Sequence, residues 1–252
     1  MASRTLKLVV EYDGTRFVGW ARQSNGLSVQ AVLEDALQVI TRESVRAEAS
    51  GRTDAGVHAL GQVVSIHLNH SITAAKMRVS LNALLPDDVA VLSVEEVADG
   101  FHARKSAKSK HYRYTILSDR VRRPLLLRTA FHVPLPLDVA AMDRAAQAWV
   151  GKHDFSAFTK LAERKPSCVR TVLSASVCKH GPLVQVDVTG TGFLYNMVRI
   201  ITGTLIDVGV GRKDEDCIAQ ILASKQRTCA GFTVPPYGLA LVEVHYAGDL
   251  RV

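Results

Sequence analysis

A loop bracketed by two glycines, Gly51 and Gly56, holds the residues of this chain that are best suited to chemistry. The loop, Ser50–Ala59, reads Ser-Gly-Arg-Thr-Asp-Ala-Gly-Val-His-Ala and lies between two apolar, strand-like stretches. Glycine tolerates positive φ and lets another backbone come close, so such a loop can present Arg52 and Asp54 while its neighbours stay packed. If the chain is extended here, these two side chains point the same way. The alternative is a structural turn in which Arg52 and Asp54 pair on the surface.

Asp54 is the leading candidate for a catalytic group. A carboxylate has a pKa of about 3.9, so it is ionised at neutral pH and needs no base to act as a nucleophile. A lone aspartate is equally able to act as a general base, a metal ligand or a turn cap. Metal sites usually gather several carboxylates or histidines, and the sequence has no Asp-x-Asp or His-Glu-x-x-His pattern. His67-x-x-His70 lacks two further nearby ligands, and Asp87–Asp88 is typical of a turn, so we expect no metal site.

Arg199 and Tyr112 are candidates for supporting roles. Arg199 lies among apolar residues near the start of a predicted helix, so we expect its face to be buried and to need a partner such as Asp54. The alternative is an exposed helical arginine. Tyr112 shares a strand face with Tyr114, which favours core packing with each hydroxyl satisfied. At a cleft, a tyrosine ring can instead stack on a base, and its hydroxyl can serve in proton transfer.

Composition indicates a folded, basic protein. Hydrophobic residues make up 47% of the 252 residues and charged residues 22%, which argues against disorder. Lys and Arg number 31 against 24 Asp and Glu, a formal charge of +7 that is compatible with a polyanionic partner such as nucleic acid. Two basic stretches, Arg104–Lys110 and Arg120–Arg128, flank Tyr112. They are either solvated loops or a track for a phosphate backbone beside an aromatic platform.

The cysteines and the N-terminus predict a cytoplasmic protein. None of the four cysteines forms a Cys-x-x-Cys pair, so we expect buried free thiols in a reducing compartment; they are Cys168, Cys178, Cys217 and Cys229. The first residues lack the long apolar region of a signal peptide. No stretch approaches the roughly 18 uninterrupted apolar residues of a membrane helix.

Periodicity predicts an α+β fold. In the first half the elements follow the order β-α-β-β-α-β, which is typical of ferredoxin-like folds. Ser28 and Thr73 are placed to cap the two helices, and Pro86 to end the second. The predicted elements are a strand Leu6–Tyr12, a helix Val29–Arg42, strands Val45–Ala49 and Gln62–Leu68, a helix from Thr73 to Leu85, and a strand Val89–Val97.

The second half repeats the α+β theme after a basic, non-periodic stretch that we interpret as a linker, Arg104–Lys110. We therefore expect an N-terminal domain over residues 1–104 and a C-terminal domain over 105–252. The predicted elements are strands His111–Leu117, Val169–Cys178, Leu183–Val188 and Leu239–Tyr246, and helices Val139–Val150, Phe193–Val208 and Lys213–Ser224, with His153–Lys160 irregular.

Six segments together resemble one family, the tRNA pseudouridine synthases of the TruA type. The run Gly-Arg-Thr-Asp-Ala-Gly-Val-His-Ala is highly specific to that family. Lys105, where an aromatic residue is expected, and Ala21, where glutamine is usual, depart from its pattern without touching the proposed chemistry. The segments are EYDGTRFVGWARQ at Glu11–Gln23, SVQAVLEDAL at Ser28–Leu37, SGRTDAGVHA at Ser50–Ala59, FHARKSAKSKHYRYTI at Phe101–Ile116, GTGFLYNMVRIITGTL at Gly190–Leu205 and PPYGLALVEVHY at Pro235–Tyr246.

The resemblance implies an activity and roles for five residues. The activity is isomerisation of uridine to pseudouridine at positions 38, 39 and 40 of the tRNA anticodon arm. Asp54 matches the catalytic aspartate, which attacks the nucleotide or helps to detach the base. Arg52 matches the arginine that enters the RNA stack, and Tyr112 the tyrosine that stacks on uracil. Arg199 matches the basic partner of the aspartate, and Leu239 lies in the segment that forms an apolar wall of the pocket.

The resemblance also implies an architecture and partners. Members are homodimers in which tRNA spans both subunits. Each subunit has two ferredoxin-like halves joined in a largely antiparallel sheet, with helices packed on it and the catalytic cleft between the halves. No redox step or hydrolysis occurs, so neither cofactor nor metal is expected. Two rival functions remain open from the residues: a non-catalytic RNA-binding protein, and a metal-dependent phosphodiesterase that uses Asp54, Asp87 and the histidines.

Overall fold

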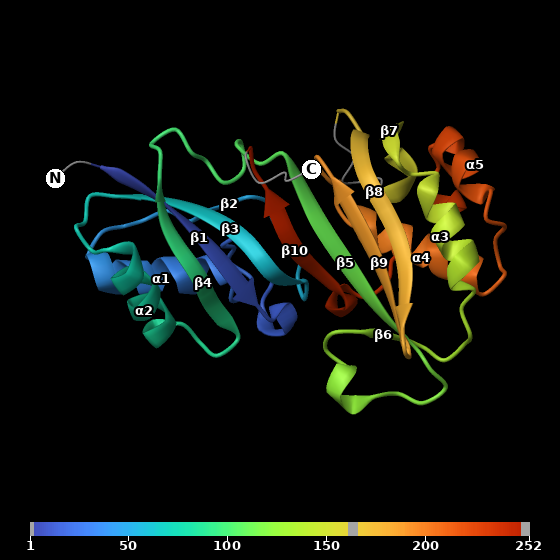
Figure 1. The fold of residues 1–252 in the computed structure, drawn as a ribbon, viewed down its shortest axis with the longest axis horizontal. Helices are drawn as coiled ribbons and strands as arrows, with labels where there is room; N and C mark the ends of the chain where they lie inside the picture. The colour runs from blue at the N-terminus through green and yellow to red at the C-terminus, as the bar shows by residue number, and fades with distance from the viewer. Residues whose placement is uncertain (1–2, 161–165, 248–252) are drawn as a thin grey trace. The chain divides into compact units, whose positions relative to one another are not determined.

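A computed structural model describes residues 3–160 and 166–247 (Figure 1). The chain divides into two compact units, which are treated separately below. Unit 1 comprises Met1–Lys108 with Leu241–Val252, and unit 2 comprises Ser109–Ala240. The sequence had placed all of 105–252 in one domain, whereas the contacts group the chain from Leu241 onward with unit 1. Within the described ranges, no helix is long and apolar enough to cross a membrane.

Unit 1 is a sheet with two helices, in the strand order β4-β1-β3-β10, and β2 pairs with β3. β1 is antiparallel to both β3 and β4, and β2 is antiparallel to β3. This is the predicted β-α-β-β-α-β arrangement. The elements are β1 (Arg4–Tyr12), α1 (Val29–Thr41), β2 (Glu48–Ala49), β3 (His58–Leu68), α2 (Ala74–Leu84), β4 (Val89–Val97) and β10 (Leu239–His245), which starts in the last two residues of unit 2.

Local sequence explains these elements. The predicted alternation in β1 is confirmed, because Leu6, Leu8, Val10 and Tyr12 are all at most 3% exposed. Ser28 caps α1 by accepting a hydrogen bond from the backbone N–H of Ala31, and Thr73 caps α2 in the same way through Lys76. Both caps were predicted.

Two strand boundaries in unit 1 were wrong. The predicted strand Val45–Ala49 forms a ladder only at Glu48–Ala49, although Val45 and Ala47 are buried with strand-like alternation. β3 begins at His58, four residues before the predicted Gln62. At Val45–Ala47 the side chains alternate between buried and exposed without strand pairing, so the sequence pattern predicted a strand where none forms. At the start of β3 the glycine-rich loop composition led the sequence pattern to miss the paired residues from His58 onward.

The segment after β4 covers the second face of this sheet. The Ala103 backbone N–H donates to Ser65 Oγ on β3 at 3.1 Å, and Tyr246 Oη donates to the Ala103 carbonyl at 2.7 Å. The centroids of the Phe101 and Tyr246 rings lie 5.0 Å apart. The predicted linker Arg104–Lys110 thus starts next to a buried anchor and runs into β5 at its last two residues.

Unit 2 contains three helices and the strands β5, β9, β8 and β7, which neighbour one another in that order. These neighbours are antiparallel, while β6 pairs with β5 in parallel. α3 packs on β8 and α4. The elements are β5 (Ser109–Ser118), β6 (Phe131–Val133), α3 (Val139–Gln147), β7 (Gly151–Asp154), β8 (Val169–His180), β9 (Leu183–Gly190), α4 (Met197–Gly209) and α5 (Cys217–Ser224).

The sequence missed β6 and β7 and placed the start of α4 too early. β6 and β7 have three and four residues, which is too short for a periodic signal. α4 begins at Met197 rather than Phe193, because Asn196 takes the left-handed conformation (φ 60°) immediately before it. Short 3₁₀ turns complete the chain at Gly14–Arg16, Pro124–Leu126, Ser156–Phe158, Arg227–Cys229 and Pro236–Gly238. The predicted α+β class, with a largely antiparallel sheet and helices packed on it, is confirmed.

A charged cluster pins β5 to β9 on the face opposite Tyr112. Asp187 on β9 accepts hydrogen bonds from His111 Nε2 at 2.5 Å and Arg113 Nε at 2.9 Å, both on β5. Burial raises the pKa of the Asp187 carboxyl, but the hydrogen bonds from His111 and Arg113 outweigh burial and hold that pKa below its ordinary value. These contacts flank Tyr112 and fix the strand on either side of it.

We predict that Asp187→Asn lowers the melting temperature at pH 7 and that its deficit relative to the wild type shrinks toward pH 3. A carboxylate whose folded pKa is depressed stabilises the fold above its unfolded pKa of about 3.9, and this stabilisation is lost as pH falls through the folded pKa. Thermal melts across this pH range measure the deficit. Exposed Asp99→Asn is the control and should show no such trend. An Asp187→Asn deficit that stays constant from pH 7 to pH 3 would contradict the account.

Candidate active site

The Asp54 loop in unit 1 lies against the backbone of the segment that follows β1. The backbone N–H of Trp20 donates to the Thr53 carbonyl at 3.1 Å, and the N–H of Gly56 donates to the Phe17 carbonyl at 3.2 Å. A Cβ on Gly14 would lie 2.1 Å from the Val57 carbonyl oxygen, and Gly14 therefore has to be glycine. Gly19 has φ +112°, and its Cβ would lie 2.6 Å from the Thr53 carbonyl oxygen.

A buried hydrogen-bond network holds the start of the same loop. Tyr12 Oη and Thr53 Oγ1 are 2.8 Å apart. Ser50 Oγ donates to Gln62 Oε1 at 2.7 Å, and Gln62 Nε2 donates to the Gly51 carbonyl at 2.9 Å. All four side chains are at most 6% exposed. Burial raises the pKa of Tyr12 to about 12, so its hydroxyl keeps its proton at neutral pH.

The loop presents Arg52 and Asp54 differently. Arg52 is exposed and Asp54 is half-buried, whereas Thr53 between them is buried. The Asp54 carbonyl accepts a hydrogen bond from the backbone N–H of Val57 at 3.1 Å, which closes a turn at Gly56 (φ 75°).

His58 anchors the far end of the loop rather than a metal. It is 7% exposed, and its Nδ1 accepts the backbone N–H of Gly14 at 3.0 Å. Asp13 Oδ1 lies 3.1 Å from the same nitrogen. Over residues 3–160 and 166–247, no group of three or more His, Cys, Asp or Glu side chains could hold a metal ion.

In unit 2, Tyr112 and Tyr114 on β5 differ in what surrounds them. Tyr112 is 8% exposed, and its ring meets that of Phe193 edge-on, with centroids 5.1 Å apart. Tyr114 is fully buried, and its hydroxyl donates to the Pro235 carbonyl at 2.8 Å. Burial raises the pKa of Tyr114 far above its ordinary value. Tyr114 is therefore a core residue with a satisfied hydroxyl, whereas Tyr112 lies at the edge of the core.

Arg199 is held in place from within unit 2. It is the third residue of α4 and is half-buried, as the apolar neighbours predicted. Its Nε donates to the Val234 carbonyl at 2.8 Å, and its Nη1 donates to Asn196 Oδ1 at 2.8 Å. Asn196 makes no capping hydrogen bond to α4, so its side chain serves Arg199 instead. Leu239, at the start of β10, is 6% exposed.

The structure therefore groups the predicted residues into two sets. Arg52 and Asp54 share the unit 1 loop, while Tyr112, Arg199 and Leu239 belong to unit 2. Sequence reasoning missed the residues that hold these in place: Tyr12, Thr53 and Gln62 in unit 1, and Asn196 in unit 2. Of these four residues, only Asn196 could have been recognised in the sequence. Asn tolerates the left-handed conformation, so an asparagine just before a predicted helix indicates where that helix starts.

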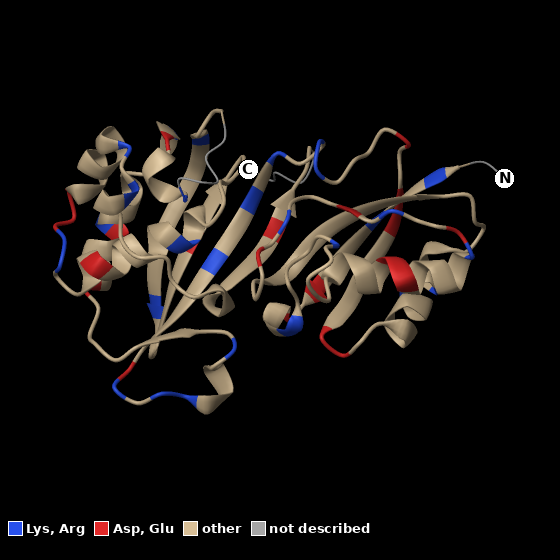
Figure 2. Ribbon diagram, turned by 180° about the vertical axis from the view of Figure 1, so that it is seen from behind, with Lys and Arg blue, Asp and Glu red and all other residues tan. Residues whose placement is uncertain are grey.

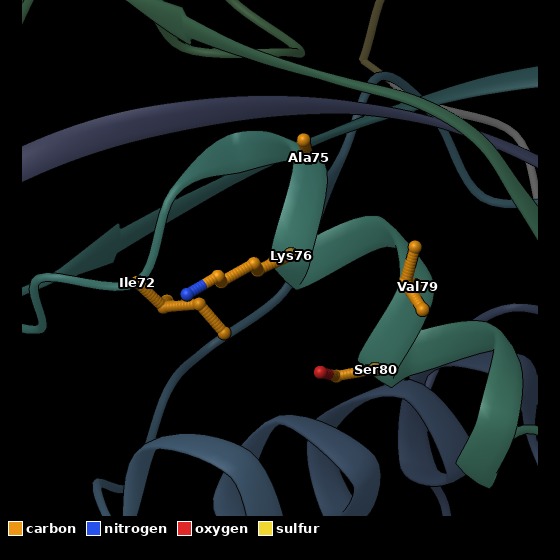
Figure 3. Close-up of a pocket in the computed structure, with 5 residues that line it drawn as sticks. All are labelled: Ile72, Ala75, Lys76, Val79 and Ser80. Carbon is orange, nitrogen blue, oxygen red and sulfur yellow. The ribbon is translucent and has the colours of Figure 1, made fainter.

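A shallow pocket elsewhere in unit 1 contains none of the predicted site residues. It lies along α2 and the residues before it, and Figure 3 shows its lining: Ile72, Ala75, Lys76, Val79 and Ser80. The lining is largely apolar with one amine and one hydroxyl. It offers no carboxylate for general acid–base work.

Comparison with known proteins decides the family. A family model described as tRNA pseudouridine synthase matches residues 8–104 and 145–247, which include all five predicted site residues except Tyr112. The chain belongs to this family. A protein named tRNA pseudouridine synthase A from Thermoanaerobacter sp. (strain X514) is 44% identical over 243 residues, covering 96% of this chain and 100% of the relative.

Other relatives agree. Proteins with the same name from Geotalea uraniireducens and Citrifermentans bemidjiense are 45% and 46% identical, each over 96% of this chain and over 100% and 98% of their own lengths. A solved structure titled "Crystal Structure of a Cbf5-Nop10-Gar1 Complex" aligns with a TM-score of 0.34 and 14% identity, over 81% of this chain and 44% of that one. At that distance it supports no argument.

We predict that Gly14→Ala destabilises the protein, because the added methyl has no room beside the Val57 backbone. Overpacking of this kind costs about 1–3 kcal/mol, or about 2–12 °C in melting temperature for a chain of this size. Differential scanning fluorimetry measures the shift. Gly100→Ala, where a Cβ meets nothing within 4 Å, is the matched control and should change little. A Gly14→Ala protein as stable as the wild type would refute the close backbone approach.

Proposed function

We propose that this protein isomerises uridine to pseudouridine at positions 38, 39 and 40 of the tRNA anticodon stem-loop, with Asp54 as the nucleophile. The family makes pseudouridine in tRNA, and the relatives bear that name over nearly the whole chain. The observation that carries the proposal for Asp54 is the loop itself. Trp20 and Gln62 bind its backbone carbonyls and Tyr12 binds the Thr53 hydroxyl, while Asp54 stays half-buried and Arg52 exposed.

The reaction rearranges one nucleotide and adds nothing to it. The bond between C1′ and N1 breaks, a bond between C1′ and C5 forms, and the proton on C5 is lost while N1 gains one. Because atoms and electrons balance within the nucleotide, the reaction needs no oxidant, reductant or hydrolytic water. We therefore propose that no cofactor or metal takes part, and that an ionised Asp54 assists the departure or transfer of the base.

Supporting roles follow for residues of both units. We assign Arg52 to fill the RNA stack, which its exposure allows. Extruding a base costs a few kcal/mol, and an arginine in the gap offsets part of it. Tyr112 would stack on uracil and take the C5 proton. Arg199, oriented by the Val234 carbonyl and Asn196, would be the basic partner of the aspartate, as the family resemblance implies, and Leu239 would form an apolar wall.

The basic loop after β5 supports an RNA substrate. Arg120, Arg122, Arg123 and Arg128 are all exposed there, and Figure 2 shows basic residues along this loop. Asp119 holds the start of the loop by accepting from the Val121 N–H and from Arg123 Nη2. Arginines on an ordered loop can contact phosphates without losing much conformational freedom. This observation favours the phosphate-track interpretation over a merely solvated loop.

Two further properties belong to the proposal. We infer that the protein acts as a homodimer, as the family resemblance implies, and light scattering coupled to size-exclusion chromatography tests this by giving one or two chain masses. We also infer a cytoplasmic location from the proposed tRNA substrate and from the lack of Cys-x-x-Cys pairs among the four cysteines. None of the four cysteines forms a disulfide bond. Cys168 is buried as expected, whereas Cys178 is exposed and Cys217 and Cys229 are half-buried.

We predict that Asp54→Ala abolishes pseudouridine formation and leaves tRNA affinity within about twofold of the wild type. The half-buried Asp54 carboxylate is negatively charged and does not bind the RNA phosphates that supply most of the affinity. Turnover is measured as the release of tritium from tRNA whose uridines carry tritium at C5. Affinity is measured by filter binding. Asp99→Ala is the control for removing an exposed carboxylate of unit 1.

Retained turnover in Asp54→Ala would contradict the nucleophile assignment. Wild-type protein that binds tRNA without turnover would favour the non-catalytic rival. Activity lost in excess EDTA would favour the metal-dependent rival.

We predict that Arg52→Ala lowers turnover more than ground-state binding, because its contact forms around the extruded base. The comparison is the single-turnover rate constant against the dissociation constant for the same tRNA. Arg78→Ala, which removes an exposed arginine from α2, should leave both unchanged. A large loss of affinity in Arg52→Ala with unchanged turnover would show that Arg52 is a phosphate contact instead.

A further inference from the structure

We propose that the buried hydroxyl pair Tyr12–Thr53 is a positioning device that sets the direction of the Asp54 carboxylate. The proposal rests on the proposed function and adds two residues to it. Tyr12 ends β1 and Thr53 immediately precedes Asp54, so the pair joins the sheet to the residue next to the nucleophile. Their oxygens are 2.8 Å apart, and the side chains are 3% and 6% exposed.

Thr53 is fixed at two points, and this determines where its neighbours point. Its hydroxyl is bound by Tyr12, and its carbonyl accepts the Trp20 N–H at 3.1 Å. Side chains alternate along extended backbone, so a Thr53 held inward turns Arg52 and Asp54 outward together. The Asp54 carbonyl is itself held by the Val57 N–H. With the backbone held on both sides, the position of the Asp54 Cα and the direction of its Cα–Cβ bond are set.

A second set of buried hydrogen bonds holds the start of the same loop. Gln62 accepts from Ser50 Oγ at 2.7 Å and donates to the Gly51 carbonyl at 2.9 Å, so one glutamine holds two consecutive residues at the start of the loop. Gln62 and Ser50 are both 0% exposed. Removing one member of such a network leaves a buried polar partner unsatisfied, and the remaining groups shift to recover a partner. A displacement of about 1 Å at the nucleophile is enough to slow a reaction strongly.

The test uses substitutions that remove one oxygen each. Tyr12→Phe and Thr53→Val each remove one of the two hydroxyls with almost no change in side-chain shape. Thr53→Ser keeps a hydroxyl at position 53 and removes only the methyl group. Tyr246→Phe is the matched control, because Tyr246 is also a buried tyrosine of unit 1 (5% exposed) that donates a hydrogen bond, to the Ala103 carbonyl at 2.7 Å. Each full-length variant is assayed for single-turnover rate, tRNA dissociation constant and melting temperature, beside the wild type and Asp54→Ala.

We expect Tyr12→Phe and Thr53→Val each to lower the single-turnover rate about tenfold, because the displaced carboxylate is less well aligned, and to leave the dissociation constant within about twofold of the wild type. The double variant should be no slower than either single variant, because both delete the same interaction. Thr53→Ser should recover most of the rate. Tyr246→Phe should lower the melting temperature comparably and leave the rate unchanged, which separates positioning from general stability.

Three outcomes would overturn the proposal. One is a Tyr12→Phe rate within twofold of the wild type, another is a double variant whose loss is the product of the single losses, and the third is a Tyr246→Phe protein as slow as Tyr12→Phe. The wild-type and Asp54→Ala arms report on the proposed function separately. If the wild type is inactive, or if Asp54→Ala is active, the function fails. If both behave as proposed and the hydroxyl variants are as fast as the wild type, only the positioning role fails.

Discussion

Two stretches of backbone, Gly14–Gly19 and Thr53–Val57, run against each other with no room for a side chain between them, and the presentation of Asp54 depends on that contact. A methyl on Gly14 or Gly19 would overlap a carbonyl of the opposite stretch. The contact fixes the loop backbone by hydrogen bonds rather than by bulky packing. A loop held in this way can leave one carboxylate accessible and keep the residues on either side of it immobile.

Unit 2 uses a similar device around Arg199. The guanidinium is held by a backbone carbonyl and by a side-chain amide of the preceding turn, so its direction is set before any substrate arrives. On the opposite strand face to Tyr112, the cluster of His111, Arg113 and Asp187 locks β5 to β9. In both units the proposed catalytic side chains are few, and the neighbouring polar residues that orient them are buried or partly buried.

Sequence patterns predicted much of this fold, and the exceptions have physical causes. The caps at Ser28 and Thr73 and the alternation in β1 are local, so they were readable from neighbouring residues. The strand predicted at Val45–Ala49 pairs only over Glu48–Ala49, because the local pattern does not show where its partner β3 lies, and the three-residue β6 is too short for a periodic signal. The candidate residues came from composition and from the family resemblance. Their supports, Tyr12 and Gln62, read as ordinary strand residues, and only the packed structure brings them to the Asp54 loop.

The central claim is that this chain makes pseudouridine in the anticodon stem-loop through the Asp54 loop. Mapping pseudouridine at single-nucleotide resolution in unmodified tRNA incubated with the pure wild-type protein tests it most directly. The account predicts new pseudouridine at positions 38, 39 and 40 wherever uridine occurs there, and none in tRNA incubated with Asp54→Ala. Pseudouridine at other positions, or the same sites modified by Asp54→Ala, would contradict it.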